Sequence, residues 1–379
     1  MKRQIILAIL LAAGNALAVE ISGTISSTLT ITEDSALTGD VTCRVPGATC
    51  ILVGASNITL RLNGFTITGQ GDPPDGCVPG GFTTNLEHAI EVTGQKRVEV
   101  LGPGIVQRAR GWGILLGGNT TLSTVKDITI SSNCLTGIQL WENTNDNLIE
   151  GVVSMRNGNR ESGCGGICLF RSHNNRFLRN VLGGNGYAVG SPNLNFGLAL
   201  SGRGNTVSEN IITGNVTGIH ITAASVDNIV YRNTISGNPP IQIPASDPAF
   251  QGFDIRNFSP EIANTIVDNV CMTYSGAGSS PCPNLGAYLF AGPNPITISD
   301  SYPYGMTTIH WNAQAAQKIE IRIGKPDGAL FARGDSRGSA QTGLWVAEGA
   351  IFFLQDVTGG KALTAANTLA TLVVRLRKL

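Results

Sequence analysis

A repeat with a fixed period dominates the middle of this chain. Residues 205–221 read N-T-V-S-E-N-I-I-T-G-N-V-T-G-I-H-I and residues 228–243 read N-I-V-Y-R-N-T-I-S-G-N-P-P-I-Q-I, so equivalent positions lie 23 residues apart. A period in the twenties, with short apolar strands between Asn and Gly corners, is typical of a solenoid. One rung cannot bury its own apolar face, so neighbouring rungs must stack. The repeat therefore predicts an all-β solenoid.

Each rung carries a Gly-apolar-x-apolar strand, and these strands predict which side chains point inward. Side chains alternate in direction along a strand. The residues expected in one stacked core are Ile138, Leu140, Ile167, Leu169, Leu198, Leu200, Ile219 and Ile221. The residues between such positions should form one outward column of Glu91, Leu115, Gln139, Cys168, Ala199, His220 and Gln242.

The Asn residues repeat in step with the strands. The aligned sets are Asn180 with Asn210 and Asn233, and Asn185 with Asn215 and Asn238. Asn tolerates left-handed backbone and can hydrogen-bond to an Asn one rung away, so we expect Asn ladders at the corners. Residues 119–238 contain 19 Asn, whereas residues 301–379 contain two. This shift predicts a domain boundary after about residue 290.

These motifs, N-x-I-x-x-N-x-I-x-G-N and G-I-x-L, resemble those of right-handed parallel β-helix proteins. The resemblance is to the bacterial secreted group with NosD-like, carbohydrate-binding and sugar-hydrolase type repeats, and it covers about residues 40–275. It implies a right-handed parallel β-helix, a scaffold that hosts many unrelated functions. NosD-like proteins are associated with copper, but the four His residues, at positions 88, 173, 220 and 310, are scattered. We therefore expect no metal and no cofactor.

The two ends of the chain differ from the repeats. Residues 1–18 have a basic start, an apolar stretch and a small-residue site ending at Ala18, as a secretory signal does. We expect cleavage there and a secreted, periplasmic or cell-surface protein whose solenoid spans 19–290. Residues 318–323 and 372–376 alternate apolar and polar like half-buried antiparallel strands. Residues 291–379 are thus predicted to form a small immunoglobulin- or fibronectin-like β-sandwich.

Eight cysteines in an exported chain favour disulfides. Short loops predict the pairs Cys43–Cys50 and Cys271–Cys282. The other four, Cys77, Cys134, Cys164 and Cys168, allow three connectivities. A metal site at Cys164 and Cys168 is the less favoured alternative.

Charge is balanced, with 26 basic and 26 acidic residues, so no nucleic-acid or membrane partner is indicated. No segment after the signal is apolar for long enough to cross a bilayer, and nothing indicates the oligomeric state. One stretch departs from the balance, because residues 156–203 contain six arginines and His173 against a single acid. Arginine matches carboxylates bidentately. Arg179, Glu209 and Arg232, by contrast, share a repeat position and should form an ion-pair ladder.

The candidate site residues follow from this arginine stretch and its neighbours. The predicted substrate-binding residues are Arg156, Arg160, Arg176, Trp141 and Glu142. The predicted catalytic residues are His173, Arg171 and His220, because a lyase or epimerase needs a base and a cation that neutralises a uronate. Polygalacturonase-type catalytic motifs are absent from the sequence. We expect an exported protein that binds, and in one hypothesis processes, an acidic polysaccharide. The alternative is a non-enzymatic cell-surface or adhesive β-helix.

Overall fold

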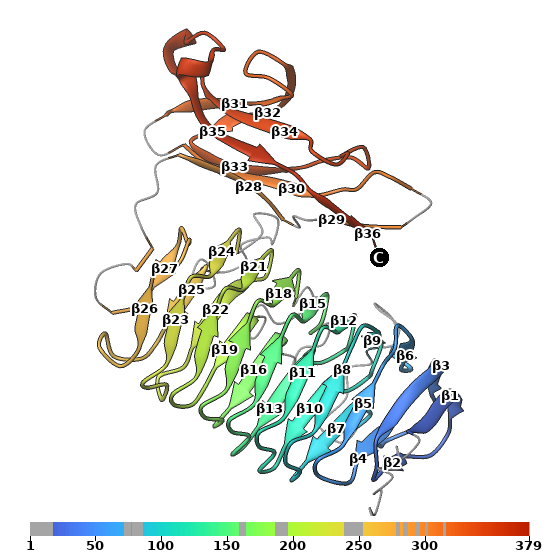
Figure 1. The fold of residues 1–379 in the computed structure, drawn as a ribbon. Coiled ribbons are helices and arrows are strands. Elements are labelled where there is room, and N and C mark those ends of the chain that lie inside the picture. Colours follow the sequence, from blue (N-terminus) through green and yellow to red (C-terminus); the bar gives the residue numbers. More distant parts are fainter. Residues whose placement is uncertain are drawn as a thin grey trace, which may run out of the picture.

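The computed structural model is an all-β molecule built from a solenoid and a second, smaller set of sheets (Figure 1). It describes residues 18–71, 77, 86–158, 164–185, 196–238, 253–277, 281–282, 287–292, 296–299, 302–313 and 316–378. Residues 1–17 of the predicted signal segment, Arg160 and Gln242 lie outside these ranges.

The solenoid consists of two parallel sheets, which makes it a parallel β-helix as predicted. The ten-stranded sheet contains β2 (Leu29–Ile31), β4 (Ile51–Val53), β7 (Ile90–Thr93), β10 (Ile114–Gly117), β13 (Ile138–Trp141), β16 (Gly165–Phe170), β19 (Phe196–Leu200), β22 (Thr217–Ile221), β25 (Ile255–Asn257) and β27 (Tyr274–Ser275). The seventeen-stranded sheet begins with β1 (Val19–Ile25) and the long β3 (Ser35–Cys43).

The remaining strands of the seventeen-stranded sheet form two parallel stacks. One stack contains β5 (Thr59–Arg61), β8 (Glu99–Leu101), β11 (Thr124–Lys126), β14 (Leu148–Glu150), β17 (Arg176–Leu178), β20 (Thr206–Ser208), β23 (Ile229–Tyr231) and β26 (Thr265–Val267). The other contains β6 (Thr66–Thr68), β9 (Ile105–Gln107), β12 (Thr129–Ser131), β15 (Val153–Met155), β18 (Val181–Gly183), β21 (Ile211–Thr213) and β24 (Thr234–Ser236). A rung such as β16–β17–β18 therefore has a first corner after β16, a second after β17 and a third after β18.

The core and register agree with the prediction. All eight inward residues, from Ile138 to Ile221, are at most 2% exposed and belong to one apolar cluster. The outward residues pair in register from Glu91 to His220. The last residue predicted for the outward column, Gln242, is not the partner of His220. Strand β22 pairs directly with β25, so Arg256 lies beside His220 on the next rung.

Three Asn ladders run along the corners, as expected. The first corner holds Asn147, Asn175, Asn205, Asn228 and Asn264; the second holds Asn180, Asn210, Asn233 and Asn269; the third holds Asn133, Asn157, Asn185, Asn215, Asn238 and finally Asp254. Each side-chain amide donates to the oxygen of the next rung over 2.8–3.3 Å. Because these amides are buried, each ladder fixes the rung spacing.

All eight cysteines form disulfides. Cys43–Cys50 and Cys271–Cys282 are paired as predicted. The open connectivity resolves to Cys77–Cys134 and Cys164–Cys168, so no thiolate remains for the alternative metal site. Four disulfides are typical of proteins outside the cytoplasm. In the described ranges, no helix has the length and apolarity needed to cross a membrane.

The C-terminal region forms antiparallel sheets around its own core, in agreement with the predicted sandwich. One sheet contains β28 (Tyr288–Gly292), β30 (Thr308–Asn312) and β33 (Arg337–Gln341), and the other contains β32 (Ala329–Asp335), β31 (Lys318–Ile323), β34 (Ile351–Asp356) and β35 (Thr368–Val373). A parallel pair, β29 (Ile296–Ile298) and β36 (Leu376–Lys378), and the 3-10 turns η4 (Thr358–Gly360) and η5 (Ala365–Asn367) complete the region. Trp311 and Phe352, from opposite sheets, belong to one buried cluster.

Candidate functional site

The outer face of the ten-stranded sheet carries an unbroken row of aromatic rings. His88 stacks on Trp112 with ring centroids 4.6 Å apart, and Trp112 lies 6.0 Å from Trp141. Trp141 stacks on Phe170 at 4.7 Å, and the guanidinium of Arg171 lies 5.0 Å from the centre of the Phe170 ring. The row therefore crosses the four successive rungs of β7, β10, β13 and β16.

The rings of this aromatic row differ in exposure, from buried His88 at 2% to half-buried Trp112 and Phe170 and exposed Trp141. Their planes are nearly parallel where they stack, at 13° for His88 and Trp112 and 26° for Trp141 and Phe170, so the stacked faces cover one another. Trp141 nevertheless remains 38% exposed. An aromatic edge carries partial positive charge, and the indole adds an N–H donor. The row is thus an apolar strip whose accessible part, Trp141 above all, favours oxygen atoms of a ligand.

Arg171 and its neighbours form the first corner beside this row. Arg171 and Glu142 make an exposed ion pair at 3.8 Å, with 72% and 49% of their side chains exposed. Such a pair contributes only about 0–1 kcal/mol. The Arg171 guanidinium can therefore leave Glu142 and bind a ligand at little cost in free energy. The Nδ1 atom of His173 accepts a hydrogen bond from the Arg203 backbone N–H at 3.0 Å. The lone pair of that nitrogen is therefore already engaged.

His220 belongs to a second aromatic group farther along the same face. Its ring stacks on Phe196 at 4.3 Å and meets the edge of Phe258 at 5.3 Å. Burial, with a smaller contribution from Arg256, lowers the pKa of His220 to about 4, so the imidazole is neutral. Its Nδ1 atom is buried and has no hydrogen-bond partner within the described chain. Arg256 occupies the next rung and lies over Phe258 at 4.7 Å.

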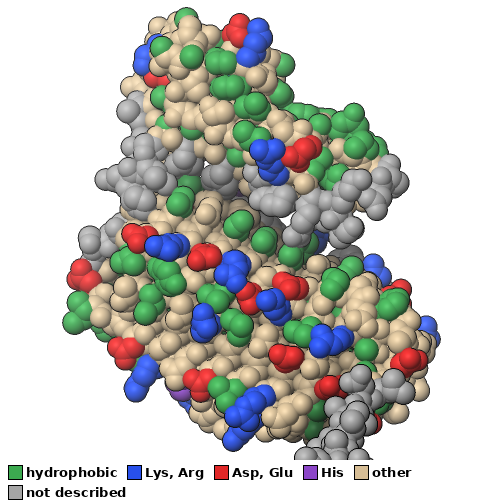
Figure 2. All heavy atoms as spheres, in the orientation of Figure 1, with side chains coloured by type: hydrophobic (Ala, Val, Ile, Leu, Met, Phe, Trp, Pro, Cys, Tyr) green, Lys and Arg blue, Asp and Glu red, His purple; other side chains and the backbone are tan. Residues whose placement is uncertain are grey.

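The other predicted arginines lie at different places around the rung. Arg156 follows β15 at a third corner, whereas Arg171 follows β16 at a first corner. Arg176 is exposed at the start of β17, on the seventeen-stranded sheet. Arg160 lies outside the described residues. Basic and acidic side chains are mixed over the solenoid face seen in Figure 2. Closeness in sequence thus does not gather these arginines into one groove, because a single rung passes through three corners.

The predicted ion-pair ladder is present in part, since Arg179 pairs with Glu209, but it continues toward the N-terminal rungs and not to Arg232. Arg179 pairs with Glu209 at 3.6 Å and also with Glu150, which pairs in turn with Lys126 at 3.2 Å. Burial raises the pKa of Glu150, but the contacts with Lys126 and Arg179 outweigh this and leave that pKa below its usual value. Arg232 instead lies 5.9 Å from the ring of Tyr231.

The histidines lie apart from one another in the described part of the chain. His88 accepts a hydrogen bond from the Trp112 backbone on Nδ1, and burial lowers its pKa to about 4 against the opposing charge of Glu91. His310 is buried in the C-terminal region, where burial lowers its pKa to about 4 as well. Across the described ranges, no three side chains of His, Cys, Asp or Glu come together as metal ligands.

Sequence reasoning found Trp141 and Arg171 but missed the residues that complete their surroundings. Both aromatic residues are visible in the sequence, Trp112 between Gly111 and Gly113 and Phe170 directly before Arg171. They were not recognised as neighbours because they occupy different positions in the repeat. Trp112 lies two residues before the inward Ile114, whereas Phe170 directly follows the inward Leu169. Arg256 follows a break in the repeat and had no visible signal.

The stacked parallel sheets define a parallel β-helix repeat protein. Residues 83–241 match the family model described as "Periplasmic copper-binding protein (NosD)". No curated protein sequence matches the chain.

Solved structures with similar folds have low identity to the chain. The Azotobacter vinelandii mannuronan C-5 epimerase AlgE4 A-module is 18% identical, with a TM-score of 0.40 over 68% of this chain and 80% of that one. The enzymatically active domain of bacteriophage CBA120 tailspike protein 2 is 10% identical, with a TM-score of 0.42 over 93% of this chain and 71% of that one. Neither likeness bears on the activity of this chain.

Proposed function

We propose that this protein binds an acidic polysaccharide along the outer face of its ten-stranded sheet. The observation that carries the proposal is the aromatic row with Arg171 at one end. Successive strands in a sheet are about 4.8 Å apart, which is comparable to the length of one sugar residue. Ring edges and indole N–H groups favour sugar oxygens, and the weakly paired Arg171 is available for a carboxylate.

The proposal extends to chemical processing of the bound polysaccharide. An elimination or epimerisation at a uronate needs a base and a cation, and this face offers neutral His220 beside Arg256 on the next rung. At the first corner, Arg171 binds the carboxylate. His173 acts as a donor through Nε2, because its Nδ1 atom already accepts a hydrogen bond. Turnover would appear as ultraviolet absorbance of unsaturated uronates or as a change in uronate composition.

Binding can be tested by affinity electrophoresis in gels that contain polygalacturonate, alginate or, as a neutral control, dextran. We expect retardation by an acidic glycan and a loss of retardation in Trp141→Ala. Trp345→Ala is the matched control, because Trp345 is 40% exposed on the C-terminal region against 38% for Trp141. If no acidic glycan retards the folded protein, the proposal fails and the non-enzymatic surface protein is the better interpretation.

A further inference from the structure

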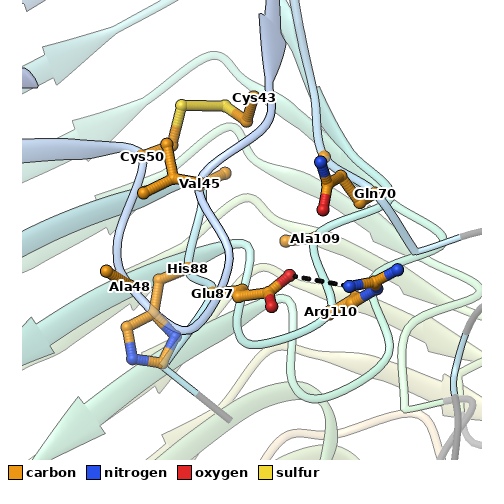
Figure 3. A pocket seen from close by; sticks show the side chains of 11 residues that line it. Cys43, Val45, Ala48, Cys50, Gln70, Glu87, His88, Ala109 and Arg110 are labelled. Carbon is orange, nitrogen blue, oxygen red and sulfur yellow. Dashed lines mark hydrogen bonds and ion pairs between the residues drawn. A yellow bond between two sulfur atoms is a disulfide. The ribbon is translucent and has the colours of Figure 1, made fainter. Parts of the chain in front are cut away.

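A small pocket lies directly beside the start of the aromatic row (Figure 3). Its lining includes the Cys43–Cys50 disulfide, Gln70, His88 and Arg110. His88 belongs to both features, since it lines the pocket and also stacks on Trp112 as the first ring of the row. A chain that followed the rings toward the N-terminal rungs would therefore arrive at this pocket.

Two of the polar side chains that line the pocket, Glu87 and Arg110, lie side by side. Figure 3 shows Glu87 and Arg110 pointing toward each other, and Glu87 Oε2 lies 3.4 Å from an Arg110 terminal nitrogen. The other oxygen of Glu87 accepts the Gly47 backbone N–H at 2.9 Å. The Nε atom of Arg110 is buried and has no acceptor within the described chain. A buried donor without an acceptor is costly to leave unpaired, so a ligand oxygen that reached this atom would relieve that cost.

The size and charge of the pocket restrict what can enter. Its enclosed volume is about 10 Å³, which is roughly what one water-sized group needs. It therefore admits a single hydroxyl group from outside, and neither a whole sugar ring nor a polymer passing through. The charges of Glu87 and Arg110 balance, so a hydroxyl that accepts from Nε and donates to the carboxylate fits better than a second carboxylate would.

We infer that this pocket is the subsite for the end of the glycan chain and that it holds a hydroxyl of the terminal sugar between Arg110 and Glu87. The inference rests on the proposed function, since the aromatic row must first hold the chain. It implies that the protein recognises chain ends, with acidic groups bound along the face by Arg171 and the neutral terminal group bound here.

Titration calorimetry with a purified oligogalacturonate hexamer and with polygalacturonate tests the inference; alginate oligomers and polymer replace them if only alginate binds. Arg110→Gln should weaken hexamer binding about tenfold, because one end contact is a large share of a short ligand's affinity. The Arg97→Gln variant, at an exposed arginine with left-handed backbone, should bind like the parent. Thermal unfolding confirms that each variant is folded.

The two proposals fail in different ways. If the parent and Trp141→Ala differ in binding but Arg110→Gln matches the parent on the hexamer, the pocket is not an end subsite and the proposed function stands. The same conclusion follows if the number of binding sites per mass of glycan does not rise as the chains are shortened. If the parent binds neither oligomers nor polymer of either glycan, the proposed function fails and the end subsite fails with it.

Discussion

Replacing Asn210 with Asp should destabilise the solenoid strongly, although the two side chains have the same shape. Asn210 is 1% exposed at the centre of the second-corner ladder. Its Nδ2 group donates to the Phe177 and Ser208 carbonyls at 3.0 Å and to the Asn233 side-chain oxygen at 2.8 Å. An aspartate oxygen in that place would face three acceptors and no donor. The ladder must then either accept a buried repulsive contact or protonate the new carboxyl.

The magnitude follows from the groups left unpaired. Each buried polar group that loses its partner costs about 1–3 kcal/mol, and a buried carboxylate facing acceptors adds a desolvation cost. Two of the three acceptors keep another donor, because the Asn233 side-chain oxygen still accepts the Asn210 backbone N–H and the Ser208 carbonyl still accepts the Arg179 backbone N–H. The residue 210 side-chain oxygen still accepts the Asn180 backbone and side-chain N–H groups at 2.9 Å, which offsets part of this loss. We expect the free energy of unfolding to fall by about 3–6 kcal/mol at pH 7, and by less near pH 4, where a proton restores one donor.

Urea denaturation followed by circular dichroism measures this change. Asn143→Asp is the matched control, because Asn143 is exposed at a first corner and its side chain takes no part in a ladder. A loss smaller than about 0.5 kcal/mol in Asn210→Asp, the range of ordinary surface substitutions, would refute the view that ladder amides hold the rungs together.

Three further predictions address the core, the end of a ladder and the ligand face. Ile219→Asp places an unpaired charge in the 0%-exposed core and should cost several kcal/mol in urea denaturation; melting like the parent would mean that the register is wrong. Burial raises the pKa of Asp254 from 3.8 to about 6. The contribution of the protonated side chain to the free energy of unfolding is therefore full below pH 4, and about 3 kcal/mol of it is lost as pH rises through 6. Stability measured against pH for the parent and for Asp254→Asn should show this difference. Arg171→Ala should weaken polyuronate binding more than Arg232→Ala, and added salt should weaken parent binding sharply, since charges at an exposed face are screened within about 8 Å at physiological ionic strength; equal effects of the two variants would remove Arg171 from the site.

The sequence was sufficient for the solenoid because its rules are local and repeat. Side-chain alternation placed Ile219 and Ile221 inside, and equal spacing aligned the Asn residues. Both rules depend only on the position within a rung. The pairs Cys43–Cys50 and Cys271–Cys282 were also local, since short loops leave few alternatives.

The site was less predictable because its contacts join residues at unlike repeat positions. Trp112 and Trp141 meet although one precedes its inward strand residues and the other follows them. Such a contact depends on how each ring leans over the sheet, which spacing does not determine. The pairing of His220 with Arg256 was hidden for another reason. The preceding core residue, Ile219, stacks on Ile255, 36 positions later, where the 23-residue period has broken.

The ends of the ladders show why Asp254, rather than Asn, closes the third corner. One of its oxygens accepts from Asn238, as a ladder Asn would, and the other accepts the Met272 and Thr273 backbone N–H groups at 2.9 and 3.2 Å. An Asn here would turn its own NH₂ toward two donors. The ladder therefore ends in Asp where the last partners are donors, and continues in Asn where they are carbonyls.

The stacking of rungs does not explain why, in the described chain, the ring of His220 keeps a buried nitrogen without a partner. Its ring points outward, and its unpaired Nδ1 is buried against Phe196, an arrangement that lowers stability without filling the core. His220→Phe keeps the aromatic stack and removes the unpaired nitrogen, so the free energy of unfolding should rise by about 1–2 kcal/mol. Any polysaccharide processing should be lost in the same variant, while retardation by the acidic glycan persists through the aromatic row. This combination is the trade-off expected when a strained polar group is kept for function. A variant that is less stable than the parent and equally active would show instead that the imidazole is a structural part of the stack.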